Sequence, residues 1–163
     1  MGADLSGTTE ALLFEVLRDV LDQLISKLEL WATSEGSAIE ELDAFIQNFV
    51  EHVIENRDAV RIFFQDFGSL SDKRRKEIAR DRDSYDHFLI ELLREAQEEG
   101  SIERDVDLKV ASYAIFGMMN WIYQWCRPTK SSTPAQIGKT MANLAIHGLA
   151  TDRSTVESAR PTT

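Results

Sequence analysis

The sequence predicts an all-α fold, a helical bundle of about six helices. Apolar residues recur at helical spacing along almost the whole chain, and no stretch sustains the period-two alternation of a strand. Only three prolines and eight glycines interrupt the 163 residues. A chain of this length suits one domain that buries roughly two thirds of its unfolded surface. We therefore expect one helical domain at residues 9–150, a disordered N-terminus at 1–8 and a disordered tail at 151–163.

Two helices are expected in the first third of the chain. The first covers about residues 9–32, where apolar residues fall on one stripe. The second opens at Ser37, because Glu40 three residues later completes a capping box. Its apolar stripe consists of Ile39, Leu42, Ile46, Phe49 and Val53.

The middle of the chain predicts a short helix followed by a long one. The short helix, about residues 58–67, carries "VRIFFQDF" and stops at Gly68. Ser71 can cap the long helix, about residues 72–99, and Gly100 follows its last turn.

Capping residues also delimit the last two helices. Asp105 or Asp107 caps the fifth helix, which ends before Pro128. The sixth is expected at residues 134–149, because Pro134 follows a threonine that can serve as its N-cap.

The fifth helix contains "YAIFGMMNWIYQWCRP", and its apolar side chains fall on two opposite sides of a helical wheel. One face consists of Val110, Tyr113, Ala114, Gly117, Met118, Trp121 and Trp125. The other consists of Ile115, Phe116, Met119, Ile122, Tyr123 and Cys126. Such a helix must be covered on both sides, either inside a large bundle or between its own core and another chain.

The sixth helix favours the second possibility. Its broad apolar stripe is studded with small residues, of which Gly138, Ala142 and Ala145 would let another helix approach closely. We therefore expect a homodimer in which the last two helices of each chain form a four-helix interface. The candidate interface residues are Trp121, Trp125, Ile137, Met141, Leu144, Ala145 and Gly148. The alternative, in which both helices complete a monomeric core, stays open.

Aromatic residues suggest a ligand pocket, because large rings in a small bundle leave gaps that only good packing closes. The candidate lining residues are Phe45, Phe49, Phe63, Phe67, Arg82, Tyr85, Phe88, Phe116, Asn120 and Tyr123. The alternative for each ring is a place in an ordinary filled core.

Arg82 is the informative member of that set, because it continues an apolar stripe that includes Ile78 and Tyr85. A guanidinium on such a face needs a partner. The partner is either an acidic effector or a carboxylate of the bundle such as Asp66, and we favour the bundle carboxylate.

Several functional classes are disfavoured. The net charge is −10 and the pI is about 4.8, so the protein surface is on average negative and is repelled by the phosphates of a nucleic acid. One cysteine, Cys126, allows neither an internal disulfide nor a cysteine-based zinc cluster. No catalytic motif, phosphate loop or Glu-x-x-His pair is present, so we expect no catalytic residues, no metal and no cofactor. Neither a signal peptide nor a membrane span is visible, and we expect a cytoplasmic protein without a membrane partner.

The segment "TEALLFEVLRDVLDQL" resembles the start of the long linker helix in TetR-family transcriptional regulators. Further resemblance lies in "ENRDAVRIFFQDFGSLSDKRRKEI", in "LIELLREAQEEGSIERDVDLKVASYAIFGMMNWIYQWCRP" and in "TPAQIGKTMANLAIHGL". The likeness extends from Glu10 to Leu149. It implies a C-terminal effector-binding and dimerisation domain of a transcriptional repressor. The pieces "FFQDFGSLS" and "WIYQWCRP" look most like regulators whose effectors are acyl-CoA thioesters.

The sequence departs from the family pattern at its N-terminus, where only "MGADLSGTTE" precedes the linker helix. We therefore expect DNA to be a partner only through a helix-turn-helix domain that this chain does not contain. The predicted function is homodimerisation and sensing of a small hydrophobic effector, such as a fatty acyl group or acyl-CoA. The alternative is a ligand-free interaction module that dimerises with an intact paralogue.

Overall fold

The structure, a computed structural model, describes residues 7–31, 36–127, 129 and 132–149. These residues form seven α-helices and one short 3-10 helix, and an isolated bridge between Thr129 and Ser132 is their only β pairing. The elements are α1 (Gly7–Trp31), α2 (Ala38–Glu55), α3 (Arg57–Asp66), η1 (Phe67–Ser69), α4 (Asp72–Glu98), α5 (Leu108–Asn120), α6 (Ile122–Trp125) and α7 (Pro134–Leu149). The prediction of an all-α bundle is confirmed.

Most helix ends follow the local chemistry of the sequence. The Glu40 carboxylate accepts hydrogen bonds from the backbone N–H and the hydroxyl of Ser37, each at 2.9 Å. Asp107 caps α5 by accepting from the backbone N–H groups of Lys109 and Val110. Gly100 follows α4 with a φ of 80°, a conformation that favours glycine.

The start of α1 differs slightly from the prediction. The helix begins at Gly7, so residues 7 and 8 are helical rather than disordered. The remaining residues of the two predicted disordered segments lie outside the described part of the chain.

At the start of α4, the hydrogen-bond partner of the Ser71 backbone N–H comes from α1 and not from a capping side chain of α4 itself. The Ser71 side chain forms no capping hydrogen bond. Its backbone N–H instead donates to the Glu10 carboxylate of α1 at 2.8 Å, and Arg74 lies 3.5 Å from the same carboxylate. The Ser71 hydrogen bonds, with a smaller contribution from Arg74, lower the pKa of Glu10. This contact ties the two longest helices together where α4 begins.

The predicted fifth helix is divided at Trp121 into α5 and the single turn α6. Trp121 has φ −70° and ψ −12°, and Gln124 donates its backbone N–H to the Trp121 carbonyl across three residues, at 3.1 Å. Arg57 Nε donates to the Tyr123 carbonyl at 2.8 Å, so α6 is held by the first turn of α3. The break between α5 and α6 therefore lies beside a hydrogen bond to Arg57, which is distant in the sequence.

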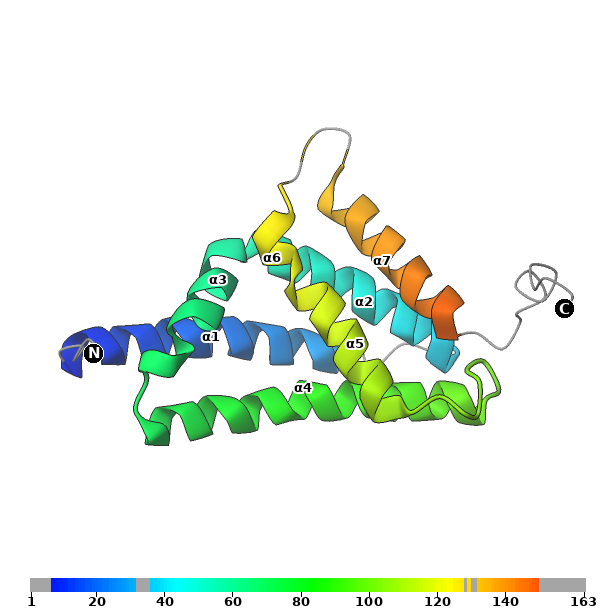
Figure 1. The fold of residues 1–163 in the computed structure, drawn as a ribbon, viewed down its shortest axis with the longest axis horizontal. Coiled ribbons are helices and arrows are strands. Elements are labelled where there is room, and N and C mark those ends of the chain that lie inside the picture. Colours follow the sequence, from blue (N-terminus) through cyan, green and yellow to red (C-terminus); the bar gives the residue numbers. More distant parts are fainter. Residues whose placement is uncertain (1–6, 32–35, 128, 130–131, 150–163) are drawn as a thin grey trace, which may run out of the picture.

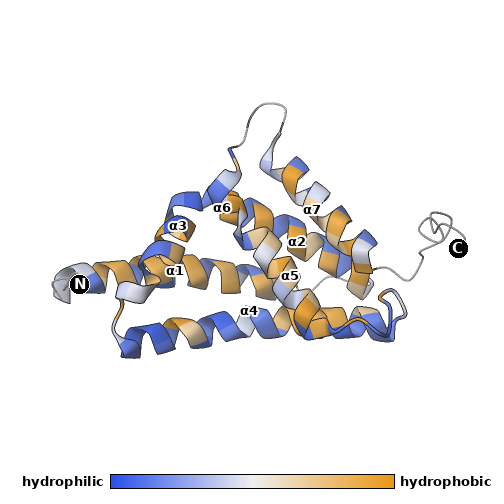
Figure 2. Ribbon diagram, in the orientation of Figure 1, coloured by the Kyte–Doolittle hydropathy of each residue, from blue (hydrophilic) through white to orange (hydrophobic). Residues whose placement is uncertain are grey.

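Helix α2 is the centre of the bundle and packs against all six other α-helices. Helices α1 and α4 lie side by side, α5 runs diagonally from α6 to α4, and α7 lies along α2 (Figure 1). Apolar residues dominate α1, α2 and α5, whereas the N-terminal half of α4 is largely hydrophilic (Figure 2). The most deeply buried side chains include Leu17, Leu42, Phe45, Ile46, Phe49, Ile78, Leu89, Leu93, Met119 and Ile122.

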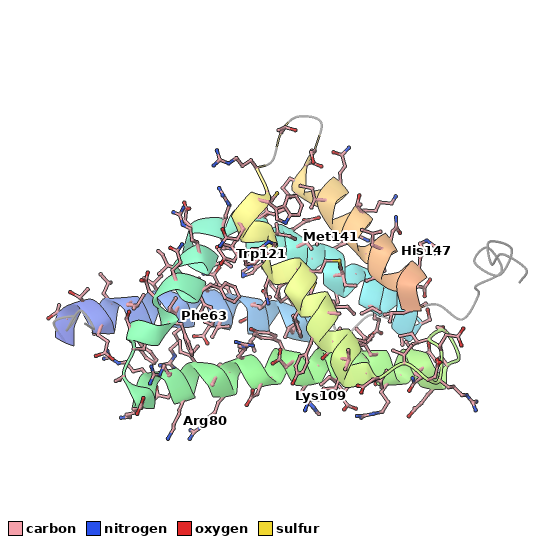
Figure 3. All side chains as sticks on the ribbon, in the orientation of Figure 1. Phe63, Arg80, Lys109, Trp121, Met141 and His147 are labelled. Carbon is pink, nitrogen blue, oxygen red and sulfur yellow. The ribbon has the colours of Figure 1, made fainter. Side chains whose placement is uncertain are left out.

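The small residues of α7 serve the chain's own core. A Cβ atom on Gly138 would lie 3.0 Å from the Gln47 carbonyl oxygen of α2, and Ala142 is fully buried. Met141 is only 7% exposed and belongs to the same core (Figure 3). The close approach expected at Gly138 and Ala142 is therefore made to α2, and Met141 has little surface left for a partner chain.

Candidate functional site

Aromatic rings from three helices meet at the centre of the bundle. Phe49 of α2 lies 5.6 Å from Phe116 of α5, measured between ring centroids. Tyr85 of α4 lies 5.3 Å from Phe116 and 6.2 Å from Phe49 in the same way. All three pairs are edge-on, the geometry that aromatic rings favour. Phe49 borders one of two neighbouring cavities, Phe116 borders the other, and Tyr85 lines both.

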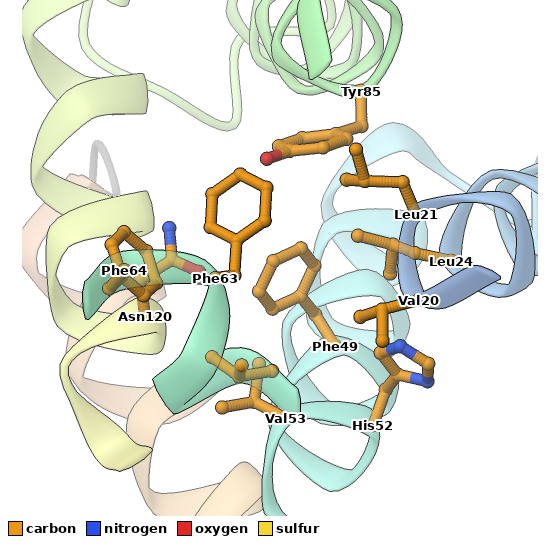
Figure 4. A pocket seen from close by; sticks show the side chains of 11 residues that line it. Val20, Leu21, Leu24, Phe49, His52, Val53, Phe63, Phe64, Tyr85 and Asn120 are labelled. Carbon is orange, nitrogen blue, oxygen red and sulfur yellow. The ribbon is translucent and has the colours of Figure 1, made fainter. Parts of the chain in front are cut away.

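The inner cavity has a volume of about 40 Å³ and lies between α1, α2 and α3, with Tyr85 of α4 and Asn120 of α5 completing its lining (Figure 4). It is mostly apolar, because α1 contributes aliphatic residues and α2 and α3 contribute aliphatic residues and rings. Its lining residues are Val20, Leu21, Leu24, Phe49, His52, Val53, Val60, Phe63, Phe64, Tyr85 and Asn120. A volume of this size holds roughly three water molecules.

The outer cavity is larger, at about 330 Å³, and more polar. It lies between α3, α4, α5 and α6, and its walls are Phe64, Arg82, Tyr85, Asp86, Tyr113, Phe116, Gly117, Asn120, Trp121 and Tyr123. Phe64, Tyr85 and Asn120 line both cavities. The two spaces are therefore neighbours separated by three side chains.

The structure brings most of the predicted ligand-site residues to these cavities. Those that line one or both are Phe49, Phe63, Arg82, Tyr85, Phe116, Asn120 and Tyr123. Phe45, Phe67 and Phe88 line neither. Phe45 is fully buried with its centroid 5.5 Å from that of Phe88, and Phe67 stacks on Phe63 at 5.3 Å. These three rings are packing residues behind the cavity walls.

Arg82 is exposed at the outer cavity, and it forms no ion pair within 4.0 Å among the described residues. The ion pair with Asp66 does not form, and the bundle carboxylate that interacts electrostatically with Arg82 is Asp86, one helical turn further along α4. Burial raises the pKa of Asp86, and Arg82 partly offsets that shift. Burial also raises the pKa of Tyr85, so this phenol stays a neutral hydrogen-bonding group. The outer cavity thus has at its edge a guanidinium and, one helical turn away, a carboxylate that interacts with it.

The site includes residues that the sequence reasoning missed. Phe64 stacks on Tyr123 with ring centroids 5.2 Å apart, and it lies between the cavities although only Phe63 of the "FF" pair was predicted. His52 lines the inner cavity from α2. Its position three residues after Phe49 places it on the same helix face, and this spacing was the available signal.

The two apolar faces predicted for the fifth helix are distinguishable in the structure. Ile115, Phe116, Met119, Ile122, Tyr123 and Cys126 are buried in the chain's own core. On the opposite face Val110, Tyr113, Trp121 and Trp125 are exposed, the two tryptophans by 60% and 55%. One face therefore completes the core, and the other is uncovered in a single chain.

A groove of about 250 Å³ separates this exposed face from α7. Its lining is apolar and rich in small side chains: Ala111, Ala114, Ile115, Met118, Leu144, Ala145, Gly148 and Leu149. Leu144 is 64% exposed, whereas Ile137 is half-buried against the core. Four of the predicted interface residues are exposed: Trp121, Trp125, Leu144 and Gly148. Ala145 is partly exposed.

The described residues offer neither a metal centre nor a membrane span. No group of three or more His, Cys, Asp or Glu side chains among them has an arrangement that would hold a metal ion. None of the described helices combines the length and the apolar character needed to cross a bilayer.

Solved structures share this fold. KstR2, the ketosteroid transcriptional regulator of Mycobacterium tuberculosis, superposes with a TM-score of 0.82 at 21% identity, over 88% of this chain and 74% of that one. The TetR-family regulator PfmR from Thermus thermophilus gives 0.79 at 25% identity, over 90% and 79% of the two chains. AibR, in complex with isovaleryl coenzyme A and operator DNA, gives 0.69 at 26% identity, over 83% and 74%.

Comparison with curated protein sequences finds no match. A profile of the family described as "Tetracyclin repressor-like, C-terminal domain" matches residues 35–149, which is more than half of the chain. The resemblance noted in the sequence, the helical architecture and this match agree. The chain belongs to the tetracyclin repressor-like C-terminal domain family of TetR transcriptional regulators.

Proposed function

We propose that this chain is the effector-sensing and homodimerisation part of a TetR-type transcriptional repressor, and that it has no catalytic activity. The observation that carries the proposal is the pair of neighbouring cavities, one mostly apolar and one edged by polar groups. Ligand sites in proteins are typically concave and mostly apolar, with a few polar groups that fix orientation. In this proposal DNA is read by a helix-turn-helix domain outside the described residues.

The cavities favour an effector with an apolar chain and an acidic head. The inner cavity accepts only apolar groups over most of its surface. At the outer cavity, Arg82 has no ion pair within the described structure, and Asn120 offers an amide. A guanidinium binds carboxylate and phosphate groups strongly. We therefore propose a fatty acyl or acyl-CoA effector, and the isovaleryl coenzyme A in the AibR structure supports this class.

Homodimerisation is proposed through the exposed face of α5 and α6 together with α7. Trp121, Trp125 and Leu144 expose large apolar surfaces there, next to a groove lined by small residues. Exposed apolar patches of this kind mark interaction sites. Because Trp121 also lines the outer cavity, an effector in that cavity would contact the proposed interface and bias its geometry.

The test is a tryptophan-fluorescence titration, since Trp121 lines the outer cavity. The probes are octanoyl-CoA, octanoate and CoA alone. We expect saturable binding of octanoyl-CoA, and we expect Arg82→Gln to weaken it about 10- to 100-fold, because a charge-assisted hydrogen bond contributes about 1.5–3 kcal/mol. Arg80→Gln is the matched control, because Arg80 lies on α4 outside both cavities.

Equal loss of affinity in the Arg80 and Arg82 variants would contradict the assigned role of Arg82. If none of the three probes binds, the effector class is wrong. A filled inner cavity and a dimer that binds none of the probes would instead support a ligand-free interaction module.

A further inference from the structure

Three side chains line both the inner and the outer cavity, and two of them are polar. They are Phe64 of α3, Tyr85 of α4 and Asn120 of α5, and together they are called the junction. A ligand that reaches from one cavity into the other lies against these side chains. The chemistry of the junction therefore decides which part of a ligand can lie between the two cavities.

Tyr85 brings a buried phenol to the junction. Its side chain is 5% exposed, and edge-on contacts with Phe49 and Phe116 hold the ring in place. Figure 4 shows the hydroxyl pointing away from α1, toward the side of the inner cavity where Phe63 and Asn120 lie. Burial raises the pKa of this phenol, so the hydroxyl keeps its proton and is a neutral donor.

Neither polar group of the junction has a hydrogen bond within the described part of the chain. The Tyr123 hydroxyl, by contrast, accepts a hydrogen bond from Gln124 Nε2 at 2.8 Å. The Tyr85 hydroxyl and the side-chain amide of the partly buried Asn120 form no such bond with a described residue. Most buried polar groups in native proteins are paired with protein, water or a ligand. The junction therefore offers two donors to an acceptor atom that lies between the cavities.

The spaces on either side indicate which acceptor fits. The inner cavity, at about 40 Å³, has room for roughly three groups the size of a water molecule or a methylene. The outer cavity, at about 330 Å³, is larger and has Arg82 in its wall. A carboxylate is better satisfied beside that guanidinium than at the junction, whose donors are neutral. A carbonyl oxygen suits the junction, because it carries no charge and no proton and its two lone pairs accept from two donors.

We propose that Tyr85 and Asn120 are specificity-determining residues that donate hydrogen bonds to the thioester carbonyl of an acyl-CoA. The acyl chain occupies the inner cavity, with room for about three carbons beyond the carbonyl, and the CoA part leaves through the outer cavity. The inference rests on the proposed effector function and deepens it, because it assigns the carbonyl to the junction.

The experiment compares two probes that differ only at the carbonyl: butanoyl-CoA and S-butyl-CoA, a thioether in which a methylene replaces the C=O group. Isothermal titration of the unaltered protein should show butanoyl-CoA bound about 10-fold more tightly, as expected for two neutral hydrogen bonds. Tyr85→Phe keeps the ring and Asn120→Leu keeps most of the volume, and each should reduce the preference to about 3-fold. The double variant should bind the two probes equally.

Ser112→Ala is the matched control, because it also removes one buried hydroxyl but touches neither cavity. Ser112 lies on α5, and its hydroxyl donates to the Lys109 carbonyl at 3.0 Å. This variant should keep the full preference for butanoyl-CoA. Loss of the preference in Ser112→Ala would contradict the specific role of the junction.

A second measurement does not depend on how the variants fold. Infrared spectra of butanoyl-CoA labelled with ¹³C at the carbonyl should show the bound C=O stretch at or below its frequency in water, because hydrogen bonds lower it. A frequency typical of an apolar solvent, or equal affinity of the unaltered protein for the two probes, would overturn the role of Tyr85 and Asn120 and leave the effector proposal intact. If neither butanoyl-CoA nor octanoyl-CoA binds, the effector proposal fails as well.

Discussion

The contact between α7 and α2 gives a sharp test of the packing, through Gly138→Ala. An added Cβ atom would lie 3.0 Å from the Gln47 carbonyl oxygen and 3.1 Å from the Gln47 Cα. Both are backbone atoms, so no side chain can rotate away to make room. The added methyl group must push α7 away from α2, which is the central helix of the bundle.

The expected magnitude follows from two opposing effects. Overpacking a well-packed contact costs about 1–3 kcal/mol. Alanine in place of glycine within a helix gains about 0.5–1 kcal/mol. Gly148→Ala, in the same helix, is the matched control, because its Cβ would meet no atom within 4 Å. We therefore expect the Gly138 variant to be less stable than the Gly148 variant by about 1–3 kcal/mol.

Urea unfolding followed by circular dichroism at 222 nm measures this difference, and thermal unfolding checks it. Each kcal/mol corresponds to about 2–4 °C in melting temperature for a chain of this size. Equal stability of the Gly138 and Gly148 variants would refute the reasoning, because it would mean that α7 does not approach the α2 backbone as closely as the structure shows.

Two further predictions concern assembly and acid stability. Leu144→Glu, on the proposed dimer face, should convert a dimer to a folded monomer in light scattering, whereas Leu12→Glu, at an equally exposed leucine of α1, should not. Acid should destabilise the fold through His52, because its pKa is lowered by burial and Lys27, with Glu55 opposing. As pH falls below about 6.5, the unfolded chain takes up a proton that the folded chain resists, so stability present above that pH is lost. Urea midpoints at pH 7 and pH 5 should differ less in His52→Gln than in the unaltered protein; an unchanged difference would contradict this assignment.

Helix boundaries were predictable because their causes are local. Asp107 hydrogen-bonds to backbone groups two and three residues ahead, and Gly100 adopts a conformation that other residues avoid. The division at Trp121 was not predictable, since neither glycine nor proline marks it. It accompanies the Arg57 contact with the Tyr123 carbonyl, which joins residues 66 positions apart.

In the candidate site, the sequence likewise could not predict which aromatic rings line a cavity and which fill the core. Phe45 and Phe49 are one helical turn apart on α2, and both were predicted to line the pocket. Phe45 is enclosed by Phe49, Phe88 and Phe116, whereas Phe49 borders the inner cavity. Periodicity predicts which side chains face inward. Whether rings fill the interior or leave a cavity depends on shapes contributed by other helices.

The two faces of the fifth helix connect the proposed site to the proposed interface. A helical wheel separates the faces correctly but cannot tell which one the chain buries, since both are apolar. The structure resolves this because α7 uses Gly138 and Ala142 to pack on α2, and so leaves α5 uncovered on its Trp121 side. Gly117 and Trp121 then line the outer cavity from the exposed face, while Phe116 lines it from the buried one. An effector that moves Phe116 of α5 relative to Trp121, where α5 gives way to α6, would therefore act on the core and on the proposed interface together, the physical coupling that the proposed sensing function requires.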